Sequence, residues 1–194
     1  MDEYKYISRY EIEEKLTGEN FKINRIIGFA LFTGPFILLL VVVYLYQQKE
    51  GGLSEQQSTD FIQIMLTVFL IMAASIYLLV AVLPKIFLSK ENLVKMLSST
   101  FVKKQDEKNS SVIKLILVDR TLMIIRLAMM EGVTLFGLVI MMLSVFNSVI
   151  YTNESYFLLV LPWIAQLIFT INNYFNKDKV VERIYNEILS VVTS

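Results

Sequence analysis

Four long apolar runs, separated by more polar segments, dominate the pattern of this chain. They cover residues 26–46, 61–83, 122–146 and 156–175. A helix needs roughly 20 mostly apolar residues to cross the hydrocarbon core of a bilayer, and each run has about that length. The pattern therefore predicts an all-α, polytopic membrane protein with four transmembrane helices.

Amphipathic stretches of helical period flank these runs. In the C-terminal tail, apolar residues recur at the spacing of one helix face: Val181, Ile184, Tyr185, Ile188 and Val192. Arg183, with its polar neighbours, falls on the other face. Residues 92–101 and 4–16 show shorter patterns of the same kind. Such helices lie on the membrane interface, pack beneath a bundle or bind a partner, and we expect these to lie against the membrane.

The segment between the second and third runs has two parts. Residues 101–111 are polar and predict a linker. Residues 112–118 are apolar but too few to cross a bilayer. This short run fits either an interfacial turn or an early start of the third helix.

Basic residues orient the predicted spans. Lys and Arg are concentrated in residues 1–25, 84–121 and 176–194, whereas the segment between the first two runs carries only Lys49 and the segment between the last two carries none. Segments rich in Lys and Arg stay on the cytoplasmic side of a membrane. We therefore expect both termini and the central segment in the cytoplasm, with the amphipathic helices on that side.

The chain also contains an internal similarity. Residues 26–34 align without gaps with residues 124–132, and residues 87–94 resemble residues 174–181. The similarity predicts two copies of one helical hairpin, related by a pseudo-two-fold axis along the membrane normal. The alternative is a chance alignment between apolar helices, which draw on few residue types.

Duplication implies two halves. The first comprises residues 1–101, with an N-terminal segment and the first hairpin. The second comprises residues 102–194, with the linker, the second hairpin and the amphipathic tail.

Charge and composition exclude several kinds of chemistry. The 18 basic and 18 acidic residues leave no net charge to attract nucleic acid. Cysteine and histidine are both absent, so thiol and imidazole catalysis, disulfides and the usual haem, copper and zinc ligands are excluded. No phosphate-binding loop, dinucleotide fingerprint or nucleophile elbow occurs. We expect no metal, no cofactor and no enzymatic activity.

One acid, Glu131, lies within the third apolar run. A carboxyl in hydrocarbon costs at least a few kcal/mol unless it has a partner, a proton or a water-filled cavity, so Glu131 is the leading candidate for a functional residue. Three polar residues lie at similar depth in the other runs: Thr33, Ser75 and Gln166. We predict that these four side chains converge in one polar layer and form an ion- or proton-binding site, with Glu131 protonated for much of the time.

The two copies differ at this level. Glu131 aligns with Thr33, so only the second copy has the acid, and the first continues as Gly34-Pro35. Pro35 has no backbone N–H, and it therefore leaves the carbonyl of Leu31 without its helical donor.

Arg126 is the nearest cation in the sequence to Glu131. Five positions correspond to about 140° around a helix, so the two side chains do not face each other. We expect Arg126 to extend toward lipid headgroups. Pairing with Asp119 or with an anionic lipid is the alternative.

Residues 127–139, Leu-Ala-Met-Met-Glu-Gly-Val-Thr-Leu-Phe-Gly-Leu-Val, resemble the proton-binding helix of rotary ATPase c subunits. The resemblance implies that Glu131 is an ion-binding carboxylate and that Gly132 and Gly137 are close-packing positions. The chain differs from that family in having only seven glycines and no G-x-G-x-G run. As a whole it looks like small bacterial membrane proteins with four helices, a likeness that implies a place in the bacterial cytoplasmic membrane but no activity.

Two functions remain open. The first is a structural or regulatory membrane protein that acts through contacts with a membrane-protein partner or another copy of itself. The second is a proton- or ion-handling subunit that uses Glu131. An intramembrane enzyme would need a further catalytic group near this acid, and the sequence offers none.

Overall fold

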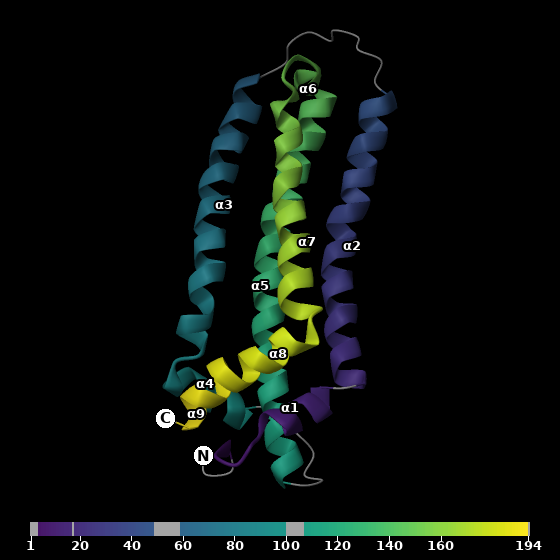
Figure 1. The fold of residues 1–194 in the computed structure, drawn as a ribbon. Helices are drawn as coiled ribbons and strands as arrows, with labels where there is room; N and C mark the ends of the chain where they lie inside the picture. Colours follow the sequence, from purple (N-terminus) through teal and green to yellow (C-terminus); the bar gives the residue numbers. More distant parts are fainter. Residues whose placement is uncertain (1–3, 17, 49–58, 100–106, 194) are drawn as a thin grey trace. The chain divides into compact units, whose positions relative to one another are not determined.

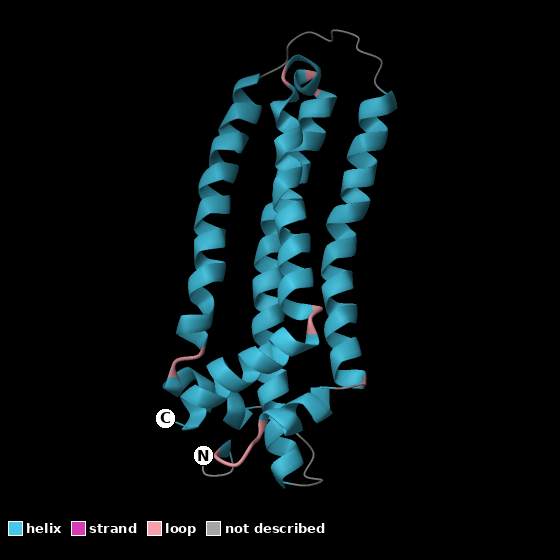
Figure 2. Ribbon diagram, in the orientation of Figure 1, coloured by secondary structure: helices cyan, strands magenta, loops and turns pink. Residues whose placement is uncertain are grey.

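The computed structural model describes residues 4–16, 18–48, 59–99 and 107–193. Helices make up almost all of this part of the chain, and it contains no strand (Figure 2). The elements, labelled in Figure 1, are α1 (Arg9–Leu16), α2 (Glu19–Gln48), α3 (Thr59–Phe87), α4 (Lys90–Ser99), α5 (Glu107–Phe146), α6 (Val149–Thr152), the 3₁₀ helix η2 (Glu154–Val160), α7 (Leu161–Tyr174), α8 (Lys177–Arg183), the π-helical segment η3 (Ile184–Leu189) and α9 (Ser190–Thr193).

Four helical stretches are long and apolar enough to cross a membrane, which confirms the four predicted spans. They are Glu19–Gln48, Asp60–Phe87, Ser111–Phe146 and Glu154–Tyr174. The third is much longer than the predicted run because α5 begins at Glu107. The apolar residues 112–118 are therefore an early part of this helix. The predicted linker 101–111 is wrong from residue 107 onward, and its earlier part lies outside the described residues.

The fourth span is not one regular helix. The 3₁₀ helix η2 precedes α7, and the N–H of Leu161 donates to the carbonyl of Leu158. Pro162 lies in the first turn of α7, where its missing N–H costs little, whereas an α-helix running through it from η2 would meet its ring. The tighter 3₁₀ turn avoids this conflict.

The chain forms two compact units. Unit 1 consists of Met1–Gly28, Ala81–Arg126 and Phe169–Ser194, and unit 2 consists of Phe29–Val80 and Leu127–Ile168. Both units take segments from residues 1–101 and from residues 102–194, so they do not correspond to the two predicted halves. Whether the hairpins are duplicates stays a prediction.

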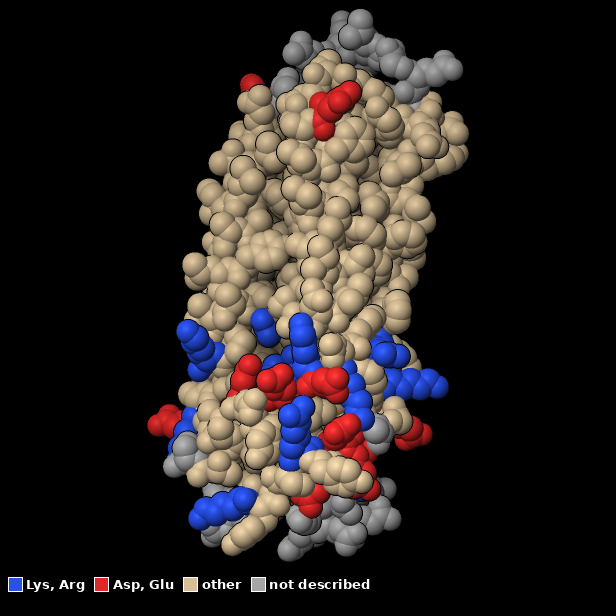
Figure 3. Space-filling model, viewed as in Figure 1, with Lys and Arg blue, Asp and Glu red and all other residues tan. Residues whose placement is uncertain are grey.

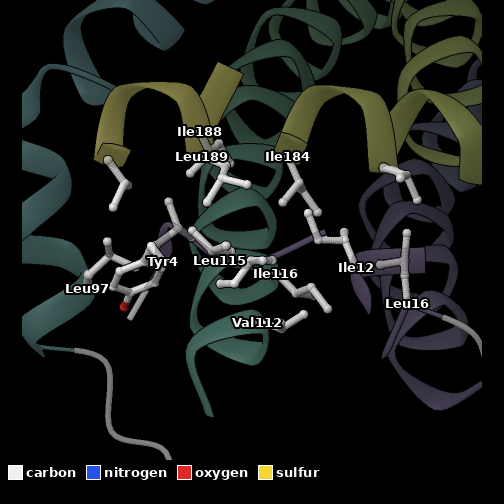
Figure 4. Packing of buried hydrophobic residues seen from close by; sticks show 14 of the residues in the cluster. Tyr4, Ile12, Leu16, Leu97, Val112, Leu115, Ile116, Ile184, Ile188 and Leu189 are labelled. Carbon is white, nitrogen blue, oxygen red and sulfur yellow. The ribbon is translucent and has the colours of Figure 1, made fainter. Parts of the chain in front are cut away.

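Unit 1 packs the amphipathic helices around the N-terminal part of α5. Figure 4 shows Leu115 and Ile116 of α5 among apolar side chains of α1, α4 and η3. The predicted apolar face of the tail and that of residues 92–99 are confirmed, with one exception, and residues 100–101 lie outside the described part of the chain. Tyr185 is exposed, and Leu189 is buried instead, because the wider turn of a π-helix changes which residues share a face.

Lysine and arginine belong almost entirely to unit 1. Every one of them except Lys49 falls in its segments, and Figure 3 shows them gathered around its helices. Unit 2, in contrast, has α5 at its core, with Val133, Leu138 and Ile140 fully buried. Many large apolar side chains of α2, α3 and α7 are exposed, as expected for surfaces that face lipid.

Candidate functional site

Glu131 lies on α5 in unit 2, beside α2. A Cβ added to Gly34 would stand 3.4 Å from its Oε1 atom, so the carboxyl lies next to the α2 backbone. The Glu131 residue is half-buried. Among the described residues, its carboxyl has no hydrogen-bond or ion-pair partner. The Glu131 carboxyl is thus partly covered by α2 but lacks a polar partner among the described residues.

A buried polar contact lies one helical turn along α5. The Thr134 hydroxyl donates to Oε1 of Gln166 at 3.1 Å, and Nε2 of Gln166 lies 3.5 Å from the Leu31 carbonyl oxygen. This carbonyl is the one that Pro35 leaves without a helical donor. Gln166 is only 1% exposed, and its side chain connects α2, α5 and α7.

Thr134 belongs to this contact but was missing from the predicted set. It stands three residues after Glu131 on the same helix face, and this spacing was the signal in the sequence that could have identified it.

The other two members of the predicted layer do not join it. Thr33 and Ser75 are both exposed. Their hydroxyls donate to carbonyls of their own helices, Thr33 to Phe29 at 2.7 Å and Ser75 to Ile71 at 2.8 Å. The predicted convergence is therefore wrong for these two residues. A serine or threonine can satisfy its hydroxyl one turn back in a helix, so it needs no place inside the bundle.

Replacing Gln166 with leucine should lower the free energy of unfolding by about 0.6–1.7 kcal/mol, the range found for polar contacts between membrane helices. The variant leaves the Leu31 carbonyl and the Thr134 hydroxyl without their contacts to this side chain. Unfolding by sodium dodecyl sulfate in mixed micelles measures the change.

The matched control for this prediction is Gln63→Leu, the same replacement at an exposed position of α3. It should change the free energy of unfolding by less than about 0.5 kcal/mol. Equal loss of stability in both variants would contradict the role given to Gln166.

The glycines implied by the rotary ATPase resemblance differ from each other. A Cβ at Gly137 would stand 3.1 Å from the Leu159 backbone oxygen and 3.1 Å from the Phe69 ring, whereas a Cβ at Gly132 would meet nothing within 4 Å. Gly137 is thus a close-packing position. Gly132 is open in the single chain.

A second polar centre lies in unit 1, where α5 meets the tail. The Arg183 side chain forms a two-pronged ion pair with Asp119, with Nε to Oδ1 at 2.6 Å and Nη2 to Oδ2 at 2.9 Å. Nη1 of Arg183 donates to the Asn173 carbonyl at 3.0 Å. Asp119 is 1% exposed and Arg183 is 9% exposed, so the assignment of Arg183 to the polar face of the tail is wrong.

The pKa of Arg183 lies above its ordinary value. Burial is the largest influence and lowers this pKa, but the charge and hydrogen bonds of Asp119, with smaller contributions from Tyr174 and Glu187, raise it further than burial lowers it. Arg183 therefore stays protonated, and its ion pair holds the tail to α5.

Arg126 lies in the same unit but does not pair with Asp119. Asp119 pairs with Arg183, and among the described residues no ion pair joins it to Arg126, so the predicted alternative of pairing with Asp119 is wrong. The guanidinium of Arg126 stands over the Phe169 ring, 4.7 Å from its centre, and Nη1 donates to the Tyr174 hydroxyl at 3.4 Å. Its Nε is buried without an acceptor.

In the part of the chain that the structure describes, no three acidic side chains gather closely enough to hold a metal ion. Comparison with known proteins yields no matching family model, no similar curated protein and no similar solved structure.

Proposed function

We propose that the chain is an integral membrane protein that acts by contact with a membrane partner, either another protein or a second copy, and not by catalysis. The observation that supports this function is the half-buried carboxyl of Glu131, which has no polar partner among the described residues. An isolated carboxyl in hydrocarbon is unfavourable by a few kcal/mol. A second chain that supplies a hydrogen-bond donor to this carboxyl would remove the penalty, and the new hydrogen bond would stabilise the complex.

The surface around Glu131 suits such a contact. Ala30 and Gly34 of α2 and Ala128 and Gly132 of α5 are exposed, and each pair is spaced by one helical turn. Small residues at this spacing let another helix approach closely in a membrane.

The proposal includes the topology. Both termini and the amphipathic helices of unit 1 are cytoplasmic, and the protein resides in a bacterial cytoplasmic membrane. The concentration of Lys and Arg in unit 1 supports this orientation. In the repeat alignment, Gly34 matches Gly132, the residue that follows Glu131. Gly34 lies beside Glu131 in the structure, so matching positions of the two copies are also neighbours, and this supports the duplication.

Glu131→Leu is the direct test of the contact. Because the carboxyl has no partner within the described residues, the isolated chain should be no less stable, whereas association with the partner should weaken at least about tenfold, equivalent to 1.4 kcal/mol. Size-exclusion chromatography and native mass spectrometry in mild detergent would measure both self-association and co-purified partners.

Glu154→Leu is the control, because this acid is exposed on η2. It should leave association unchanged. If Glu131→Leu assembles as well as this control, the proposed contact at Glu131 is wrong.

Proton or ion handling is the second candidate function, and the absence of a cation partner for Glu131 among the described residues favours it. A carboxyl without a fixed countercharge can take up and release a proton. In vesicles that contain a pH-sensitive dye, Glu131→Asp would keep proton flux and Glu131→Gln would abolish it. Co-purification with rotor and stator parts of an ATP synthase would favour the rotary subunit; equal flux in wild type and Glu131→Gln would exclude both forms of this function.

A further inference from the structure

Tyr174, the last residue of α7, lies between two arginines in unit 1. The guanidinium of Arg183 stands over its ring at 4.6 Å from the centre, and Nη1 of Arg126 donates to its hydroxyl oxygen. The side chain is 1% exposed. Tyr174 therefore brings two positive groups close to one buried hydroxyl.

This cluster has an excess of donors. Arg183 is neutralised by Asp119, which uses both carboxylate oxygens for this purpose. Arg126 has no carboxylate partner among the described residues, and its Nε has no acceptor. The Tyr174 hydroxyl accepts from Arg126, and its own proton meets no acceptor in the described part of the chain. What the cluster lacks is a negatively charged acceptor.

The aromatic neighbour does not supply the missing charge. The face of Phe169 attracts the Arg126 guanidinium by a cation–π interaction, but a ring carries no net charge. Stacking on Phe169 also holds the plane of the Arg126 guanidinium in place, so that its remaining N–H groups keep a fixed direction. A guanidinium held in a fixed plane favours an anion such as a carboxylate or a phosphate, whose oxygens can accept two parallel N–H bonds.

From this arrangement we infer that Arg126 and Tyr174 form a binding site for a phosphate group, carried either by an anionic phospholipid headgroup or by free phosphate. A phosphate offers separate oxygens to the guanidinium N–H groups and to the tyrosine O–H. Arg126 stands near the start of the third apolar run, within reach of the headgroup region of a bilayer. The site is independent of Glu131 and of the contact proposed for it.

The test uses the full chain purified in mild detergent. Native mass spectrometry counts phosphatidylglycerol and phosphatidylcholine molecules that stay bound, and phosphorus NMR measures binding of inorganic phosphate. Arg126→Gln should weaken phosphatidylglycerol binding about tenfold, the usual effect of losing one charge-assisted contact. Tyr174→Phe, which removes only the hydroxyl, should weaken it about threefold, corresponding to one neutral hydrogen bond.

Arg25→Gln is the matched control, because Arg25 is exposed and stacks on Phe21 in the same unit. It should keep binding within about twofold of wild type. Competition by inorganic phosphate identifies free phosphate as the ligand, whereas retention of phosphatidylglycerol in excess phosphate identifies the headgroup.

Two results would overturn the site: equal loss in Arg126→Gln and Arg25→Gln, or no preference of the wild type for phosphatidylglycerol over phosphatidylcholine together with no binding of phosphate. If Arg126→Gln does not fold, Arg126→Lys takes its place. This variant keeps the charge but not the planar fork, and unchanged binding by it and by Tyr174→Phe would also refute the site.

Discussion

The Arg183→Met variant is expected to lose about 3–5 kcal/mol of unfolding free energy, because it leaves the Asp119 carboxylate buried without its countercharge. Asp119 is almost fully enclosed on α5, and Arg183 is the ion-pair partner that the structure gives it among the described residues. The tail from α8 onward should separate from α5 first. Limited proteolysis would show early cleavage in the tail, and unfolding in mixed micelles would give the free energy.

Removing both charges distinguishes a lost ion pair from lost packing. The double variant Asp119→Leu/Arg183→Met should recover much of the stability, since apolar side chains of similar volume replace buried ion pairs at little cost. Recovery will be incomplete because Arg183 also binds the Asn173 carbonyl. A double variant as unstable as Arg183→Met alone would show that the pairing is not what stabilises this junction.

The control for Arg183→Met is Lys177→Met. Lys177 forms an ion pair with Glu13 at 3.2 Å, but both side chains are partly exposed. Exposed pairs contribute about 0–1 kcal/mol, so this variant should unfold within that range of the wild type. The two variants thus compare removal of the basic partner from a buried and from an exposed ion pair of one unit.

Gly137→Val should have the second largest effect, a loss of about 1–3 kcal/mol from overpacking. Its Cβ would already stand 3.1 Å from the Leu159 backbone oxygen, and a backbone atom cannot move aside as a flexible side chain can. The same Cβ would stand 3.1 Å from the Phe69 ring, and valine adds two further methyl groups to this crowded position. Unfolding in mixed micelles measures the loss.

Gly132→Val is the matched control for this second prediction, five positions earlier on the same helix. A Cβ there meets no atom within 4 Å, so the stability of the isolated chain should change by less than about 0.5 kcal/mol. If the surface around Glu131 binds a partner, Gly132→Val should still weaken assembly. Equal unfolding of the two valine variants would contradict the packing described for Gly137.

The four spans could be predicted because the length of an apolar run is a local property of the sequence. The apolar faces of the tail and of α4 were predictable for a similar reason, since the period of a helix is local. The ion pair between Asp119 and Arg183 was not, because its members are far apart along the chain and each looks like an ordinary surface charge. Thr33 and Ser75 were misplaced because a hydroxyl that bonds its own helix gives no sign of this in the sequence.

For Gln166 and Glu131, the sequence allows an estimate of their level along the helices but not of their partners. Counting residues from the ends of the runs predicted Gln166 at the level of Glu131, whereas in the structure its side chain contacts Thr134, one turn further along α5, and the Leu31 carbonyl. It could not tell that Glu131 has no polar partner among the described residues. Depth follows from the rise per residue, whereas partners depend on the rotation of each helix, which the apolar pattern of these runs defines poorly.

The missing N–H of Pro35 makes α2 easier to bend between Leu31 and Pro35. The backbone hydrogen bonds of a regular helix resist bending. Here one of them, to the Leu31 carbonyl, is missing, and a long contact from Gln166 takes its place. Thermal flexing of unit 2 should concentrate at this level, next to Gly34. Because Gly34 lies beside the Glu131 carboxyl, bending at this level changes the distance between that carboxyl and the α2 backbone without breaking a backbone hydrogen bond.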